Sequence, residues 1–174
     1  MKTRKILLLP ALFVLVFSCK KEDSSIKTTD NTNPTNNNGV VYNVNESTML
    51  QLVNNARQTG CTCGTTVMPP VAAVTWNDQL SKAADDHTVD MKSKNYFSHT
   101  GSDGSDPGVR ITAVGYSWQA YGENIALGYA DEQAVMNGWL HSEGHCKNIM
   151  NAGFAEMGAA REGDYWTQDF GKKQ

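Results

Sequence analysis

The sequence predicts an α+β domain in which helices pack on a small antiparallel sheet. Its 174 residues fit one domain of ordinary size. Segments with helical periodicity come first along the chain, and strand-like segments come late. The strand-like segments are residues 157–161 and 165–170, and the Glu-Gly-Asp sequence between them is typical of a hairpin loop.

Two long helices are expected in the first half of the domain. Residues 46–58 carry apolar side chains at helical spacing, and Gly60 is a stop signal. Residues 78–94 repeat this pattern, with His87 on the apolar face, where a buried core histidine is commoner than a metal ligand. The segment between these helices, residues 61–70, is rich in Gly, Thr and Pro and is expected to be a loop.

Shorter elements are expected in the second half. Residues 100–108 form a polar loop, and residues 110–114 are expected to make one helical turn. Residues 131–140 predict a third helix, because two acidic residues at its start suit the helix dipole. Residues 142–150 predict a short fourth helix, with Ser142 as its cap.

The first 18 residues resemble a removable export signal. A basic start is followed by an apolar run of twelve residues, 6–17, which is too short to span a bilayer as a helix. The run ends in Ser18-Cys19, which resembles a bacterial lipobox, in which the cysteine becomes the lipid-carrying N-terminus. We therefore expect residues 1–18 to be a lipoprotein signal peptide and Cys19 to be acylated. The alternative is an ordinary signal peptide with an accidental cysteine.

The domain itself is expected to span residues 46–174. Residues 19–45 contain the acylated cysteine and then a polar stretch that cannot bury enough apolar surface to offset its ordering entropy. This stretch predicts a flexible tether between the lipid bilayer and the domain.

The charge balance argues against a nucleic-acid partner. The chain has 15 Lys and Arg against 18 Asp and Glu, a net charge of −3. Loss of the signal peptide would remove three of the basic residues, whereas proteins that bind phosphate backbones are normally basic.

His99 and Glu123 are the most informative polar residues. His99 follows a helical segment at the start of a Gly- and Asp-rich loop, a place where functional residues are common. Glu123 lies in the sequence YGENIA, between a glycine and an apolar pair, so its carboxylate is expected to be held near the core. A carboxylate in that environment needs partners, which histidines can supply.

The sequence HSEGH, residues 141–145, does not form a zincin motif. That motif is His-Glu-x-x-His on one helix. Here the glutamate comes one position later, at Glu143, and therefore points away from the face that His141 and His145 would share.

Three cysteines remain if Cys19 is acylated. In an exported protein a disulfide is favoured, and Cys146 can pair with Cys61 or Cys63. Either bond closes a loop of ~85 residues and contributes ~4 kcal/mol in the chain-entropy model. A zinc site formed by the three cysteines and His145 is the alternative.

Six blocks of sequence, in a fixed order, resemble the CAP superfamily of cysteine-rich secretory proteins, antigen 5 and pathogenesis-related proteins. The blocks are LVNNAR (52–57), VTWNDQL (74–80), YFSHT (96–100), YGENIA (121–126), WLHSEGH (139–145) and YWTQDFG (165–171). The bacterial extracellular branch, termed SCP-like, is the most similar. The resemblance implies a three-layer α-β-α sandwich.

The resemblance also implies a cavity. In this family two histidines and two glutamates line it, and the first of each corresponds to His99 and Glu123. The second glutamate and second histidine of eukaryotic members fall on Ser142 and Tyr165, whereas the bacterial branch has a histidine at the position of His145. The implied cavity residues are His99, Glu123, His145, Tyr165 and Gln168, with His141 nearby.

Three functions are compatible with such a cavity. The first choice is a binding module at the bacterial envelope, anchored in the lipid bilayer through Cys19 and facing an envelope or extracellular ligand. In it His99 and His145 could hold Zn or another divalent cation. The alternatives are a metal-assisted hydrolase of peptide or envelope material and a carrier of a lipid or sterol. In a purely structural role, the same histidines and glutamate would only hydrogen-bond loops.

Overall fold

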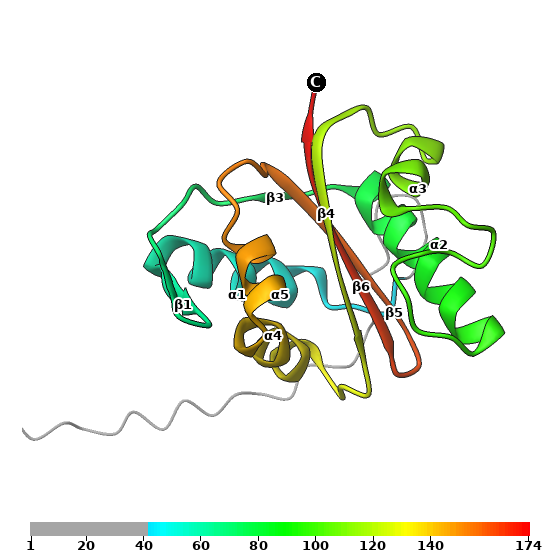
Figure 1. Ribbon diagram of the computed structural model, residues 1–174, viewed down its shortest axis with the longest axis horizontal. Helices are drawn as coiled ribbons and strands as arrows, with labels where there is room; N and C mark the ends of the chain where they lie inside the picture. The colour runs from blue at the N-terminus through cyan, green and yellow to red at the C-terminus, as the bar shows by residue number, and fades with distance from the viewer. Residues whose placement is uncertain (1–41) are drawn as a thin grey trace, which may run out of the picture. The chain divides into compact units, whose positions relative to one another are not determined.

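The computed structural model describes residues 42–174 (Figure 1). The expected signal peptide, Cys19 and most of the tether lie outside the described residues. Within residues 42–174, no helix is long and apolar enough to cross a membrane.

A four-stranded sheet forms the middle of the domain. Its strands are β3 (Thr75–Trp76), β4 (Trp118–Leu127), β5 (Glu156–Glu162) and β6 (Tyr165–Lys173), in the order β3-β5-β6-β4. The β5–β6 hairpin turns at the predicted Glu-Gly-Asp sequence, where Gly163 has φ +61°. β4, β5 and β6 are antiparallel, but β3 is parallel to β5. The sheet is therefore mixed, whereas the sequence analysis expected an antiparallel one.

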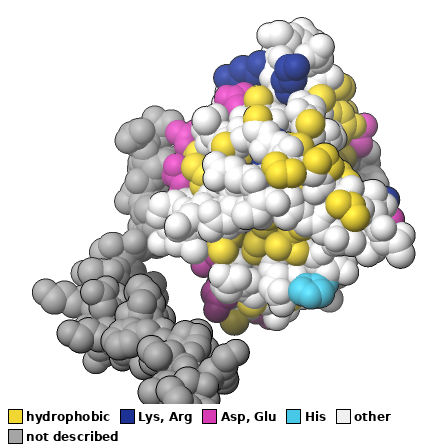
Figure 2. Space-filling model, turned by 90° about the vertical axis from the view of Figure 1, so that its left-hand side faces the viewer, with side chains coloured by type: hydrophobic (Ala, Val, Ile, Leu, Met, Phe, Trp, Pro, Cys, Tyr) yellow, Lys and Arg dark blue, Asp and Glu magenta, His cyan; other side chains and the backbone are white. Residues whose placement is uncertain are grey.

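Helices cover both faces of this sheet (Figure 1). On one face α2 (Asp78–Lys94) crosses β5 and β6, and α3 (Pro107–Ala113) packs on α2 and β4. On the other face lie α1 (Glu46–Thr59), α4 (Glu132–His141) and α5 (Glu143–Ile149). The α+β class and the three layers are thus confirmed. Figure 2 looks toward the side of α1 and α4, where small groups of hydrophobic side chains alternate with polar ones.

The two faces of the sheet differ in the size of their side chains. Toward α1, α4 and α5, the strands contribute large apolar groups such as Trp166 and Phe170 to the main core. Toward α2 they contribute small or polar groups, so this helix approaches closely. A Cβ at Gly158 would lie 2.1 Å from the backbone nitrogen of Ser81, which only glycine avoids.

Two segments form strands that were not predicted from the sequence. β4 was not predicted, because Gly122 and Asn124 are rare in strands and the acid between them suggested a loop. In the structure all ten residues lie along β6, where tertiary packing overrides the weak local preference. The expected loop 61–70 contains a small hairpin formed by β1 (Cys61–Cys63) and β2 (Thr66–Met68).

A disulfide ties this hairpin to α5. It joins Cys63 to Cys146, with 5.4 Å between the Cα atoms, and leaves Cys61 as a thiol. Of the two pairings considered from the sequence, the structure therefore contains the one with Cys63.

Arg57 fastens α1 to the segments around it. Its side chain is fully buried and donates hydrogen bonds to four backbone carbonyls. The acceptors lie 2.7–3.2 Å away and belong to Ala72, Ile149, Asn151 and Phe154. One guanidinium thus supplies hydrogen-bond donors to backbone carbonyls in three places. These are the end of α5, the segment before β3 and the segment before β5.

Replacement of this arginine should be strongly destabilising. We expect Arg57→Ala to lower the free energy of unfolding by about 3 kcal/mol or more, because it leaves several buried carbonyls without donors. Urea unfolding followed by tryptophan fluorescence measures the change. Lys82→Ala, in an exposed pair on α2 with Asp86, is the control and should change the stability by less than about 0.5 kcal/mol. Similar losses in the two variants would contradict this role.

Candidate functional site

Glu123 is the centre of the candidate site. It lies on β4, the edge strand, with its side chain only 2% exposed on the face covered by α2 and α3. Its Oε1 atom lies 2.7 Å from Nδ1 of His99, and its Oε2 atom accepts a hydrogen bond of 2.6 Å from Arg110. We call these three residues the Glu123 cluster. A buried carboxylate is stable only with such partners.

Arg110 holds the loop of His99 as well as the carboxylate. It lies on α3, whose N-terminus is capped by Asp106 through a 2.9 Å bond to the backbone nitrogen of Val109. The guanidinium also donates to the carbonyls of His99 (3.0 Å) and Ser105 (2.9 Å). Both ends of the loop are therefore fixed relative to Glu123.

A second carboxylate, Asp90 of α2, secures the same loop. It accepts hydrogen bonds from the Tyr96 hydroxyl and from both the backbone nitrogen (2.9 Å) and hydroxyl (2.7 Å) of Ser102. Partial burial acts to raise the pKa of Asp90, but these bonds and Lys94 hold it well below its usual range. Burial and the bond to Asp90 raise the pKa of Tyr96 to about 12. The loop is thus held by an ionised carboxylate and a neutral phenol.

This arrangement orients the ring of His99. Because Nδ1 faces Glu123, Nε2 is the nitrogen left for other partners, and the side chain is 52% exposed. A carboxylate bound to one ring nitrogen, with the other directed outward, is the usual outer-shell arrangement around metal-binding histidines. The geometry therefore suits His99 for binding a metal or a polar ligand through Nε2.

His145 approaches from the other side of the sheet. It lies on α5, and its backbone carbonyl accepts a 3.3 Å hydrogen bond from Asn124 of β4. Burial lowers the pKa of His145, and the charge of His99 lowers it further. The two imidazoles are therefore within electrostatic range of each other, and His145 is neutral near neutral pH, as a metal ligand must be. Two histidine nitrogens with open positions for water are a ligand set of the kind that zinc accepts.

The structure does not bring Tyr165 and Gln168 into this cluster. Gln168 is fully buried on the opposite face of the sheet, where its Oε1 atom accepts a 3.0 Å bond from Asn124 and its amide nitrogen lies 3.9 Å from Met49 Sδ. Tyr165 pairs with Leu127, four residues along the strands from Glu123. Strand alternation explains the direction of the Gln168 side chain. Successive side chains of a strand point to opposite faces, and it is the neighbouring Asp169 that faces α2.

Asp169 is a site residue that sequence reasoning missed. It lies directly opposite Glu123 in the β4–β6 ladder, is 1% exposed, and its Oδ1 atom has no hydrogen-bond partner in the described part of the chain. Burial raises the pKa of Asp169 well above its ordinary value, and the charge of Glu123 raises it further, so the uncharged form of Asp169 is favoured. The sequence feature that could have identified Asp169 is an acidic residue within a strand whose other residues are mostly buried.

His87 lies behind the cluster and agrees with the expected core histidine. It is fully buried, with Nε2 2.9 Å from the carbonyl of Ser98 and 4.0 Å from Glu123 Oε1. Burial lowers its pKa, which outweighs the opposing attraction of Glu123. His87 therefore supports the segment that leads to His99 rather than the exposed side of the site.

A small apolar groove lies next to the cluster on the side of α3. Its volume is about 410 Å³, within the range of small-molecule pockets. Trp118 and Tyr121 pack edge to face in it, with 4.6 Å between ring centroids, and Val109 is exposed at its margin. Tyr121 precedes Glu123 by two residues on β4, so both side chains lie on the same face of the sheet.

Residues 50–170 match the cysteine-rich secretory protein family, CAP. The chain belongs to the CAP family. Among known proteins, it is similar to YlbC of Bacillus subtilis (strain 168), described as an uncharacterized membrane protein, with 36% identity over 103 residues. That match covers 59% of this chain and 30% of YlbC, and this chain spans about a third of the length of the Bacillus relatives that it matches.

Solved structures have the same fold. An extracellular SCP-domain protein of Bacillus anthracis superposes with a TM-score of 0.64 at 32% identity, covering 74% of this CAP chain and 40% of the other. An outer surface protein of Borrelia burgdorferi gives 0.63 at 20% identity, covering 74% and 92%. NaASP2, crystallised with Zn²⁺, gives 0.51 at 15% identity, covering 74% and 80%.

The two neighbouring carboxyl groups should respond in opposite ways to neutralisation. Glu123→Gln removes the charge that pairs with Arg110 and should cost about 3 kcal/mol of stability, because a buried cation loses its partner. Asp169→Asn is isosteric with the protonated acid and should leave stability unchanged or raise it. Urea unfolding at neutral pH compares them. Equal losses in both variants would contradict the assignment of the charge to Glu123.

The same pair predicts a pH dependence. Because the pKa of Asp169 is raised in the folded state, the folded protein retains a proton that the unfolded chain releases above about pH 4. Stability due to this group is therefore present at low pH and is lost as pH rises toward the folded-state pKa. The stability of Asp169→Asn relative to the wild type should increase between about pH 4 and neutrality. Unfolding curves at several pH values test this, and a constant difference would refute it.

Proposed function

We propose that this CAP protein is an exported, lipid-anchored protein of the bacterial envelope that acts as a binding module. Its His99–His145 pair holds Zn²⁺ or another divalent cation. The observation that carries this proposal is the orientation of His99, whose Nδ1 is bound by the buried Glu123 and whose Nε2 is left for a ligand.

The chemistry of the donors supports a metal. The pKa of His145 is lowered, so its nitrogen is available without loss of a proton near neutral pH. Glu123 acts from the outer shell, where its hydrogen bond to Nδ1 fixes the orientation of the ring. The zinc present in the crystals of NaASP2 supports the idea for a chain of the same fold. A bound cation would offer its remaining positions to water or to an anionic group of an envelope ligand.

The relatives support an envelope location. They are described as extracellular, outer-surface or membrane proteins. The sequence around Cys19 supplies an anchor of the acyl type, in which each buried methylene contributes roughly 0.8 kcal/mol of membrane affinity. The lipid bilayer is then one partner, and an envelope or extracellular molecule at the His99–His145 pair is the other.

Binding is better supported than hydrolysis. A metal-assisted hydrolase needs a group that can accept a proton from the attacking water. Both oxygens of Glu123 are already engaged, by His99 and Arg110, so this carboxylate is placed to orient rather than to transfer a proton. As a hydrolase, the protein would lose its cleavage of peptide or envelope material in His99→Ala, Glu123→Ala and His145→Ala.

The groove beside Trp118 and Tyr121 is the observation in favour of a carrier. Its lining is mainly apolar and its volume suits a small hydrophobic ligand or part of a larger one. A lipid or sterol carrier would show saturable binding of labelled fatty acids or sterols that is lost in Trp118→Ala.

Zinc titration of the full chain tests the binding proposal. We expect one zinc ion per oxidised wild-type chain, with affinity reduced at least about 100-fold in His99→Ala and His145→Ala, because each removes a ligand. Glu123→Gln should weaken binding about 10–100-fold, as expected for an outer-shell residue. Isothermal titration calorimetry measures all three.

The matched control is His141→Ala. His141 is an exposed histidine whose Nδ1 lies 2.7 Å from the carbonyl of Asn137, and its loss should leave zinc affinity unchanged. Absence of zinc binding by a folded wild-type chain would reject the metal. Losses of stability in the His99 and His145 variants without any effect on metal or ligand binding would assign these residues a structural role.

The lipid anchor is tested separately. Mass spectrometry of the protein from a bacterial membrane fraction should find an N-terminus at Cys19 with the mass of acyl chains added, and Cys19→Ser should release the protein from the membrane. An unmodified N-terminus, or cleavage at another residue, would contradict the anchor.

A further inference from the structure

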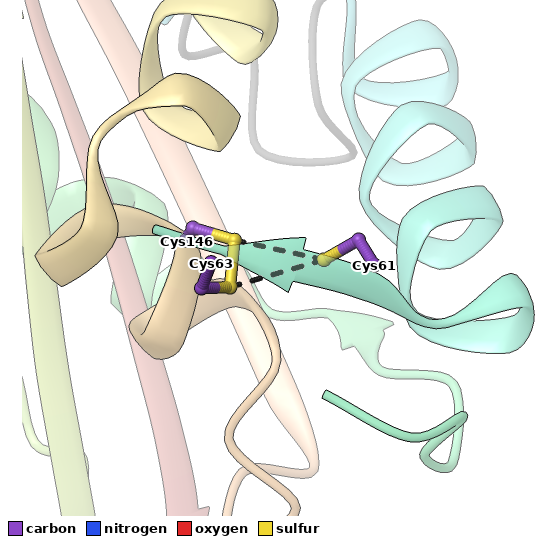
Figure 3. Close-up of side chains that lie close together, drawn as sticks. All are labelled: Cys61, Cys63 and Cys146. Carbon is purple, nitrogen blue, oxygen red and sulfur yellow. Dashed lines mark hydrogen bonds between the residues drawn. A yellow bond between two sulfur atoms is a disulfide. The ribbon is translucent and has the colours of Figure 1, made fainter. Parts of the chain in front are cut away.

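Three sulfur atoms from β1 and α5 lie close together (Figure 3). Cys63 and Cys146 form the disulfide, and the thiol of Cys61 lies beside it. Its Sγ atom is 3.6 Å from that of Cys146 and 3.8 Å from that of Cys63. In residues 42–174 this is the one group of three or more Cys, His, Asp or Glu ligand atoms that all lie within 4.8 Å of one another.

Packing and hydrogen bonds act together with the disulfide to hold the elements that carry these atoms. Cys61 and Cys63 are two residues apart on β1, so their side chains point to the same face of the strand. Cys146 lies on α5, whose last carbonyl is bound by Arg57 and whose Ile149 is part of the main core. β1 and α5 are therefore held against each other by packing as well as by the covalent bond.

The spacing of the sulfurs matches that of a thiolate metal site. Tetrahedral zinc has Zn–S distances of ~2.3 Å, which place neighbouring sulfurs ~3.8 Å apart. Cys61 is already near this distance from both other sulfurs. Cleavage of the disulfide frees its two sulfurs to separate, which would complete a triangle of the right size.

We propose that Cys61, Cys63 and Cys146 form a redox-gated site for a thiophilic divalent cation such as Zn²⁺, separate from the His99–His145 pair. While the disulfide is present, two of the three ligands are bonded to each other and the site is closed. Reduction by a dithiol or phosphine opens it. With a dithiol, two electrons and two protons pass to the disulfide, giving two cysteine thiols and leaving the reductant as its own disulfide. With a phosphine, the phosphorus supplies the two electrons and water supplies the two protons, and the oxygen of the water ends in the phosphine oxide. The metal then displaces three protons from three thiols.

The surroundings explain which ions would fit. Cys63 and Cys146 are fully buried and Cys61 is partly exposed, so a fourth coordination position would face solvent beside Cys61. Three thiolates with a divalent cation carry a net charge of −1. The same thiolates with a monovalent cation would carry −2, which is more costly to bury.

Cobalt(II) is the probe for this site, because its thiolate complexes have intense charge-transfer absorption. Every protein is the full chain with Cys19→Ser and His99→Ala, so that Cys19 contributes no sulfur and the histidine pair is disabled. The phosphine-reduced chain should bind one cobalt ion with thiolate charge-transfer absorption and release it to zinc. The oxidised chain should show no such absorption.

Two variants on the same strand form a matched pair. Cys61→Ser keeps the disulfide partners but removes one ligand, and should weaken cobalt binding by the reduced chain at least about 100-fold. Thr62→Ser changes the exposed residue between the two cysteines, on the opposite face of β1, and should have no effect.

Three results would overturn the proposal. The first is a folded, reduced chain without thiolate–cobalt absorption. The second is equal affinity in Cys61→Ser and Thr62→Ser. The third is loss of the far-ultraviolet circular dichroism of the domain on reduction, since packing would then not hold the sulfurs together. Because all chains lack His99, none of these results depends on the histidine pair.

Discussion

The carboxylate of Glu123 is the constraint on which the site depends. It is buried on an edge strand, where an unpaired charge would be unstable, so it must be satisfied by groups brought from other layers. Arg110 of α3 and His99 of the preceding loop meet this need. Burial and the charge of Glu123 raise the pKa of Asp169, opposite it on β6, which disfavours a second buried charge. One ionised acid thus fixes the position of a loop, a helix and an imidazole.

The position of β4 at the edge of the sheet explains how a site can form around this residue. An edge strand has an unpaired side past which groups from both helical layers can reach. His99 arrives from the layer of α2 and α3, and His145 from the layer of α4 and α5. The disulfide lies in that second layer, one residue along α5 from His145, and fastens the helix to β1. Elements of both helical layers therefore hold the two histidines.

Much of the fold could be predicted from the sequence, because apolar periodicity and turn residues locate α1, α2, α4 and the β5–β6 hairpin within a few residues. The motif resemblance located His99 and Glu123, which the structure brings together. It could not locate Arg110, which reaches Glu123 from α3, or Asp169, which lies opposite Glu123 in the β4–β6 ladder. Both contacts depend on β4, and Gly122 and Asn124 make this strand hard to predict from the sequence. Gln168 was among the cavity residues that the resemblance implied, and strand alternation directs its side chain to the face opposite that of Glu123.

The claim that Glu123 orients the ring of His99 is tested most directly by determining which ring nitrogen of His99 carries the proton. If Glu123 orients this ring, the neutral imidazole carries its proton on Nδ1 and leaves Nε2 bare. Long-range proton–nitrogen correlation spectra of the ¹⁵N-labelled, metal-free full chain at mildly alkaline pH distinguish the two nitrogens. The account predicts a protonated Nδ1 and an unprotonated Nε2 whose resonance shifts when zinc is added. A proton on Nε2, with Nδ1 bare, would contradict it.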